Sequence, residues 1–120
     1  MENPVNEDQL QAKCFKWFDE TFPAERKMLF AVPNGDERDK RTANKLKAMG
    51  VQPGVSDLVF VTDEVTFIEM KFGNGVQSDG QKVFEAKVLE RGHSYRLCYT
   101  FEEFKTLILK LLARYERSRI

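Results

Sequence analysis

The sequence has few of the side chains that hold transition metals or form disulfides. Its only histidine is His93, and its two cysteines, Cys14 and Cys98, are far apart with no CxxC motif. A zinc site is therefore not expected. Two reduced thiols are the default for such a pair, which favours a cytoplasmic location.

Long apolar runs and a charge excess are also missing. No hydrophobic stretch reaches the roughly 18 residues needed to cross a bilayer, so no membrane contact is expected. The opening 1–4 is polar and acidic, unlike a secretory or transit peptide. The 19 basic and 19 acidic residues cancel, so a nucleic-acid partner would have to be attracted by a local basic patch.

What is present fits one folded domain over residues 1–120. Hydrophobic residues make up 42% of the sequence and charged residues 32%, as in ordinary globular proteins. Apolar periodicity, caps and turn residues predict eight elements in the order α-β-α-β-β-α-β-α. The expected ranges are helix 7–22, strand 28–32, helix 36–49, strands 57–61 and 65–71, helix 79–91, strand 95–99 and helix 101–114.

Three charged residues lie where buried strands should have none. Asp57 begins one apolar strand, and Glu69 and Lys71 end the next. Alternation of side chains along a strand places Glu69 and Lys71 on one face, and neighbouring strands lie about 4.8 Å apart. Two carboxylates and an ammonium at one point of an apolar sheet predict a divalent-metal hydrolytic site.

The length of the hairpin loop tests this interpretation. A two-residue loop, Asp63-Glu64, would place Asp57 on the wrong face, whereas the three-residue loop 62–64 places it opposite Glu69. The three-residue loop also pairs Val59 with Phe67. Both faces of the hairpin are otherwise apolar, so helices should cover both sides of a mixed sheet.

Five motifs follow one another along the chain: Pro33-Asn34-Gly35, Leu46 to Gly50, Pro53 to Asp57, Ile68 to Lys71 and Ser78 to Gln81. In this order they resemble the VRR-NUC family of virus-type replication-repair nucleases, within the PD-(D/E)xK superfamily. The resemblance covers about residues 7–109 and points to the stand-alone form of phages and bacteria. Ser56 departs from it, because the superfamily has proline at that turn position. The resemblance implies a restriction-endonuclease-like α/β fold and a bacterial or phage-infected cell.

The resemblance implies roles for the residues of the charged cluster. Asp57 and Glu69 would be metal ligands, the backbone carbonyl of Met70 would be a further ligand, and Lys71 would orient or polarise the attacking water. An oxygen-only ligand set favours Mg²⁺ or Mn²⁺.

Two more site residues come from the same resemblance. Gln81 matches the glutamine of the following helix that supports the site. Glu7 matches the acidic residue of the first helix that completes the metal environment, although the adjacent Asp8 could be mistaken for it. Acidic residues also favour helix N-termini for purely structural reasons.

A basic helix between the first strand and the catalytic hairpin is a candidate DNA contact. Its charges would equally suit a solvated helix face. The residues concerned are Arg38, Arg41, Lys45 and Lys47.

We therefore expect a metal-dependent, structure-selective DNA endonuclease. Small stand-alone members of the family resemble Holliday-junction resolvases, and two symmetric cuts by a one-site domain imply a homodimer. The alternatives are a monomeric nickase or flap nuclease, and a nucleic-acid-binding module that does not cleave.

Overall fold

The computed structural model describes residues 3–33 and 39–119. The expected order of elements is confirmed, with one short 3-10 helix, η1, added after the first helix. The elements are α1 (Glu7–Thr21), η1 (Pro23–Glu25), β1 (Leu29–Ala31), α2 (Lys40–Ala48), β2 (Leu58–Val61), β3 (Val65–Met70), α3 (Asp79–Glu90), β4 (Ser94–Cys98) and α4 (Phe101–Ser118).

The strands form one mixed sheet in the order β1-β2-β3-β4. β1, β2 and β3 pair antiparallel, and β4 runs parallel to β3 because α3 connects the two strands as a crossover. Val59 pairs with Phe67 and Val61 with Val65, so the three-residue loop is confirmed. This register places Asp57 and Glu69 on the same side of the hairpin.

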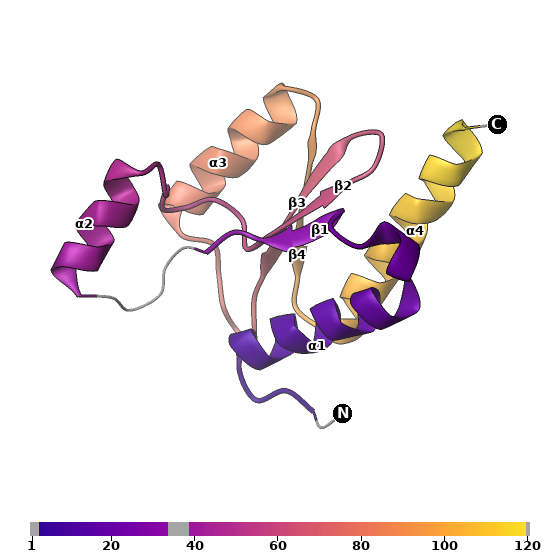
Figure 1. Cartoon of the computed structure of the whole chain (residues 1–120), viewed down its shortest axis with the longest axis horizontal. Coiled ribbons are helices and arrows are strands. Elements are labelled where there is room, and N and C mark those ends of the chain that lie inside the picture. Colours follow the sequence, from indigo (N-terminus) through magenta and orange to yellow (C-terminus); the bar gives the residue numbers. More distant parts are fainter. Residues whose placement is uncertain (1–2, 34–38, 120) are drawn as a thin grey trace.

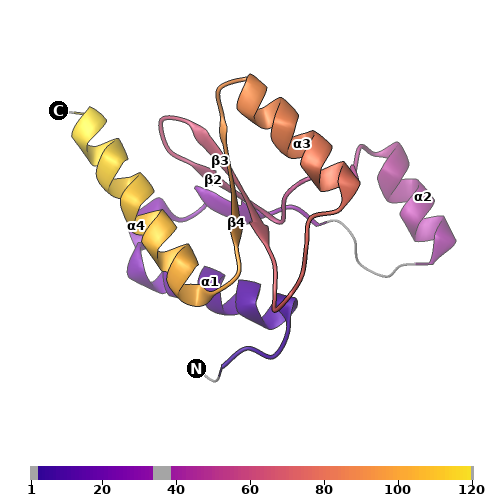
Figure 2. The same cartoon turned by 180° about the vertical axis from the view of Figure 1, so that it is seen from behind.

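Helices cover both faces of the sheet, as expected (Figures 1 and 2). On one face, α1 and α4 enclose the main core, in which Phe18 lies against Phe60 with ring centroids 5.5 Å apart. On the other face, Phe84 of α3 lies edge-on to Phe67 at 5.1 Å. Glu69 follows Phe67 by two residues on β3, so its side chain lies on the same face of the sheet. The charged cluster and α3 are therefore on the same side.

Two helices differ from their expected ranges. The final helix continues past residue 114 to Ser118, and Arg114 within it is bound by Glu64 of the β2–β3 turn. The basic helix begins at Lys40, where the side chain of Asp39 accepts from the backbone N–H of Thr42. The part of its expected range at 36–38 lies outside the described residues. In Figure 1, α2 stands away from the sheet.

No helix among the described residues is both long and apolar enough to span a membrane.

Candidate metal centre

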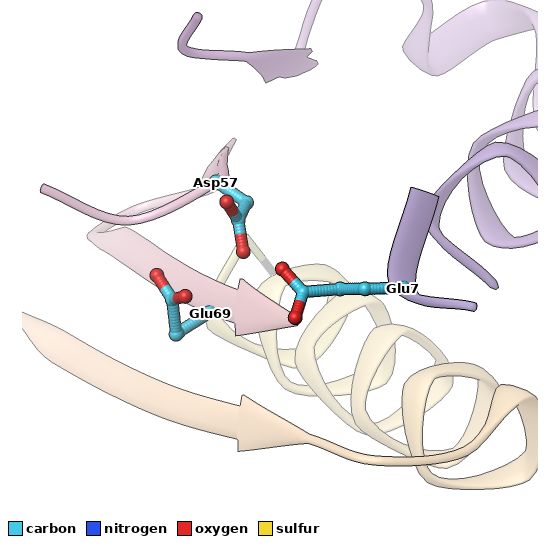
Figure 3. A group of neighbouring side chains, drawn as sticks. All are labelled: Glu7, Asp57 and Glu69. Carbon is cyan, nitrogen blue, oxygen red and sulfur yellow. The ribbon is translucent and has the colours of Figure 1, made fainter. Parts of the chain in front are cut away.

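Three carboxylates from three separate elements converge at the end of the hairpin (Figure 3). Glu7 comes from the first turn of α1, Asp57 from the residue before β2, and Glu69 from β3. One oxygen of each lies within 4.8 Å of the others. Glu69 is only 1% exposed, whereas Glu7 and Asp57 are partly buried. Solvent therefore reaches the cluster from the side of Glu7 and Asp57.

Local structure explains how Asp57 and Glu7 reach the cluster. The backbone N–H of Met70 donates to Oδ2 of Asp57 at 2.8 Å, which ties the start of β2 to the end of β3. Asn6 caps α1 by accepting from the backbone N–H of Gln9, and this fixes the first turn that carries Glu7. Asp8 is exposed and lines a different groove, so the structure brings Glu7, not Asp8, to the cluster.

The side chain of Gln81 connects the cluster to α3. Its Nε2 donates to Oε2 of Glu69 at 2.8 Å, and its Oε1 accepts from Nζ of Lys71 at 2.9 Å. The same Oε1 accepts from the backbone N–H of Ser78, and Oγ of Ser78 accepts from the backbone N–H of Gln81. This capping box holds the amide at the start of the helix in a single orientation.

Lys71 completes the charged group beside Glu69. Its Nζ lies 3.5 Å from Oε2 of Glu69, and the residue is only 8% exposed. An ammonium in this position is a compact point charge that interacts with its partners more strongly than it would in water.

The electrostatics of the cluster disfavour three negative charges in the absence of a cation. The pKa of Glu69 is raised to about 8, chiefly by burial and also by the neighbouring charge of Asp57, while Lys71 acts in the opposite direction. Burial also raises the pKa of Glu7, again with help from Asp57. Carboxylates that repel one another in this way gain stability when a cation joins them.

The donor set fits a hard divalent cation. Oε1 of Glu69 is buried and has no hydrogen-bond partner among the described residues. Metal–oxygen distances of about 2.1 Å place opposite oxygens of an octahedral Mg²⁺ site about 4.2 Å apart, close to the observed spread of the three carboxylates. The cluster therefore provides the acidic, oxygen-only ligand set that a divalent metal ion requires.

The backbone carbonyl of Met70 was also expected to be a metal ligand. The side chain of Met70 is fully buried in the opposite face of the sheet, so only its backbone borders the cluster. Its carbonyl as a metal ligand remains a prediction.

The expected DNA-contacting residues lie on α2. Arg41, Lys45 and Lys47 are all exposed, and α2 stands away from the sheet (Figure 1). Arg38 falls outside the described residues. Their contact with DNA therefore remains a prediction.

A contact between two glycines was not anticipated. Gly54 has φ of +85°, and a Cβ built on it would lie 3.0 Å from the carbonyl carbon of Gly80. The loop before Asp57 thus packs backbone-to-backbone on the first turn of α3, which carries Gln81. The Pro53-Gly54 turn and a glycine inside the first turn of a helix were the available signals in the sequence.

The comparisons with known proteins agree with this architecture. The chain is similar to a solved structure described as a VRR_NUC domain protein, with a TM-score of 0.66 and 19% sequence identity. The alignment covers 95% of this chain and 90% of that one. No family model and no curated protein matches the sequence. The chain has the VRR-NUC fold, which confirms at the level of the fold the resemblance found in the sequence.

Proposed function

We propose that this protein is a metal-dependent, structure-selective DNA endonuclease. The observation that carries the proposal is the convergence of Glu7, Asp57 and Glu69, with Lys71 beside them, on a VRR-NUC fold. Binding alone gives no reason to bury a carboxylate with an unpaired oxygen, because such a group is costly without a compensating cation.

The residues of the cluster would divide the work of phosphodiester hydrolysis. Glu7, Asp57 and Glu69 would hold Mg²⁺ or Mn²⁺, which supplies charge neutralisation and activation of water when bound. Lys71 would place a positive charge beside the attacking water or the phosphate. Gln81 would keep Glu69 and Lys71 in a fixed relative orientation, as outer partners of metal ligands do.

We further propose that the enzyme acts on four-way DNA junctions as a homodimer. The described residues of one chain hold one such carboxylate cluster, and two symmetric cuts need two. Exposed apolar side chains around the edge strand β1, among them Phe30 and Phe15, support self-association. A monomer that cuts flaps or nicks is the alternative.

Cleavage of labelled four-way junction, flap, nicked and linear duplex DNA in magnesium or manganese tests the proposal. The wild type would be compared with Glu69→Ala, and Glu7→Gln with its neighbour Asp8→Asn as a matched control. Paired symmetric cuts that require metal, Glu69 and Glu7 but not Asp8 would support a dimeric resolvase. Cuts confined to flaps or nicks would exclude the resolvase, and no metal-dependent cleavage of any substrate would exclude the nuclease.

A further inference from the structure

A second cavity, of about 380 Å³, opens on the sheet face that carries the carboxylate cluster. It lies between the sheet, α3 and the segment that leads from α2 to β2, which runs beside the start of α3 in both views (Figures 1 and 2). Its lining is mostly apolar or aromatic, and Gln52 and Ser56 are the polar residues that border it. The apolar side chains include Met49, Val51, Val55, Val59, Phe67 and Phe84.

Two elements carry both cavity residues and cluster residues. Phe67 precedes Glu69 by two residues on β3, so both side chains lie on the same face of the sheet. Phe84 follows Gln81 by three residues on α3, so both lie on the same side of the helix. A ligand in the cavity would therefore be next to a group held at the carboxylates.

The shape and lining of the cavity suit one flat heterocycle. Its volume is at the lower end of the range for small-ligand pockets. The rings of Phe67 and Phe84 stand edge-to-face, with centroids 5.1 Å apart, and offer aromatic surface. Met49 lines the mouth of the cavity and is 71% exposed. This exposure is unusual for a large, flexible, apolar side chain.

Positive charge lies close to the mouth. Met49 caps the C-terminus of α2, and Lys45 and Lys47 occupy the last turn of that helix. Gly50, with φ of +104°, then reverses the chain so that Val51 returns to the cavity wall and its N–H bonds to the carbonyl of Leu46. The apolar cavity thus has lysines on one side and the carboxylate cluster on the other. This arrangement matches a DNA strand, in which bases alternate with phosphates.

We propose that this cavity receives one unstacked nucleobase of the DNA strand whose phosphate lies at the carboxylate cluster. The inference rests on the proposed nuclease function and adds the origin of substrate choice to it. A base must leave its stack to enter, and this costs less at a junction, flap, nick or mismatch than in continuous duplex. Stacking on aromatic side chains tolerates any base, so the cavity would select DNA by its structure and not by its base sequence.

The test uses 2-aminopurine, an adenine analogue whose fluorescence is quenched by stacking on neighbouring bases, placed in turn at each position near the cut of a branched DNA. The full chain is bound in calcium, whose longer and looser coordination disfavours cutting. Val51→Trp fills the cavity, and Met49→Glu places a negative charge at its exposed mouth without changing the core. Val83→Trp and Val83→Glu are the matched controls, because Val83 lies on α3 and is 58% exposed outside the cavity.

We expect emission to rise at one position with the wild type and both Val83 variants, and to stay quenched with both cavity variants. Val51→Trp should also weaken binding about tenfold, on the scale of one lost base–aromatic contact. Far-ultraviolet circular dichroism and melting would show whether Val51→Trp folds; if it does not, Met49→Glu decides.

Two results would overturn the inference. The first is emission that rises nowhere, or rises equally with the cavity variants. The second is a change of oligomeric state by the cavity variants in sedimentation without DNA, which would assign the cavity to a protein interface. Cleavage in magnesium is measured separately. Normal cleavage without a change in emission would exclude the base pocket alone. No cleavage of any DNA would exclude the nuclease function, and the emission would still test the pocket.

Discussion

The side-chain amide of Gln81 donates to Glu69 Oε2 at 2.8 Å, so the first turn of α3 directly restrains the most buried carboxylate of the cluster. The same amide oxygen also accepts from Lys71. One uncharged side chain thus sets the separation of a carboxylate and an ammonium. Helix capping and site geometry are coupled through it, and variants of the cap can separate the two roles.

We expect Gln81→Ala to lower cleavage about 10- to 100-fold, the usual effect of removing an outer partner of a metal ligand. Ser78→Ala is the matched control, because it removes the cap acceptor and leaves the contacts of Gln81 with Glu69 and Lys71. Both variants should lose about 1 kcal/mol of unfolding free energy. Denaturant unfolding and cleavage rates check this. Equal losses of cleavage in the two variants would show that Gln81 acts only as a cap.

Lys71→Met should separate catalysis from metal binding. The ammonium is held 3.5 Å from Glu69 and is almost fully buried. In the proposed mechanism, its removal takes a positive charge away from the reacting phosphate. We expect cleavage to fall about 10²- to 10³-fold, as for the loss of one electrostatic contact in an active site.

Manganese should still raise the melting temperature of Lys71→Met, since the three carboxylates remain. Lys82→Met, an exposed lysine of α3, is the control and should cut normally. Loss of the manganese-dependent stabilisation in Lys71→Met would assign the lysine to the integrity of the metal site instead.

The sequence predicted most of the fold, because the strands carry strong apolar runs bounded by turn residues. The pairing of Val59 with Phe67 followed from loop parity alone, since a shift of one residue would have moved every side chain of the strand to the other face. The last turn of the final helix was not predicted, nor was the ion pair between Arg114 and Glu64, which joins residues 50 positions apart. Local patterns carry no signal for such a contact.

Only part of the arrangement of the charged residues was predicted, again because local patterns do not show contacts between distant residues. Alternation along β3 placed Glu69 and Lys71 together, and these are the residues whose geometry depends on one strand. The choice between Glu7 and Asp8 depends on how α1 is rotated against the sheet, which is set by burial of Leu10, Cys14 and Phe18. The cavity beside the cluster arises from three elements that meet only in the folded chain, so no motif marks it.

The contact between Gly54 and Gly80 leads to a prediction about how Asp57 is positioned. Gly54→Ala places a Cβ 3.0 Å from the carbonyl carbon of Gly80, and its φ of +85° is strained for alanine. Gly92→Ala is a close control, with φ of +83° and open space around the added Cβ. The control should lose about 1 kcal/mol of unfolding free energy through backbone strain alone.

We expect Gly54→Ala to lose about 2–3 kcal/mol, because the loop must also move away from α3. The displacement should shift Asp57 relative to Glu69 and lower both cleavage and stabilisation by manganese. Gly92→Ala should keep both. Equal losses of stability in the two variants, with cleavage intact, would show that the glycine contact does not position the site.

The carboxylate cluster also predicts how stability depends on pH without metal. The pKa of Glu69 is about 8 in the folded chain, against 4.5 as its ordinary value, so the folded state retains a proton that the unfolded state has released between those pH values. The stability that Glu69 contributes is complete below about pH 4.5 and is lost as the pH rises through about 8, with a slope near 1.4 kcal/mol per pH unit. Glu7, whose pKa is also raised, acts in the same direction.

Divalent metal should reverse this trend, because its ligands must be deprotonated. The gain in melting temperature from magnesium or manganese should therefore grow from pH 5 to 8, as a ligand of the folded state raises the midpoint. Glu69→Gln should flatten the metal-free pH profile and abolish most of the gain, whereas Glu90→Gln, on the exposed side of α3, should keep both responses. A metal-induced gain that does not change with pH, or that survives in Glu69→Gln, would place the bound cation away from these carboxylates.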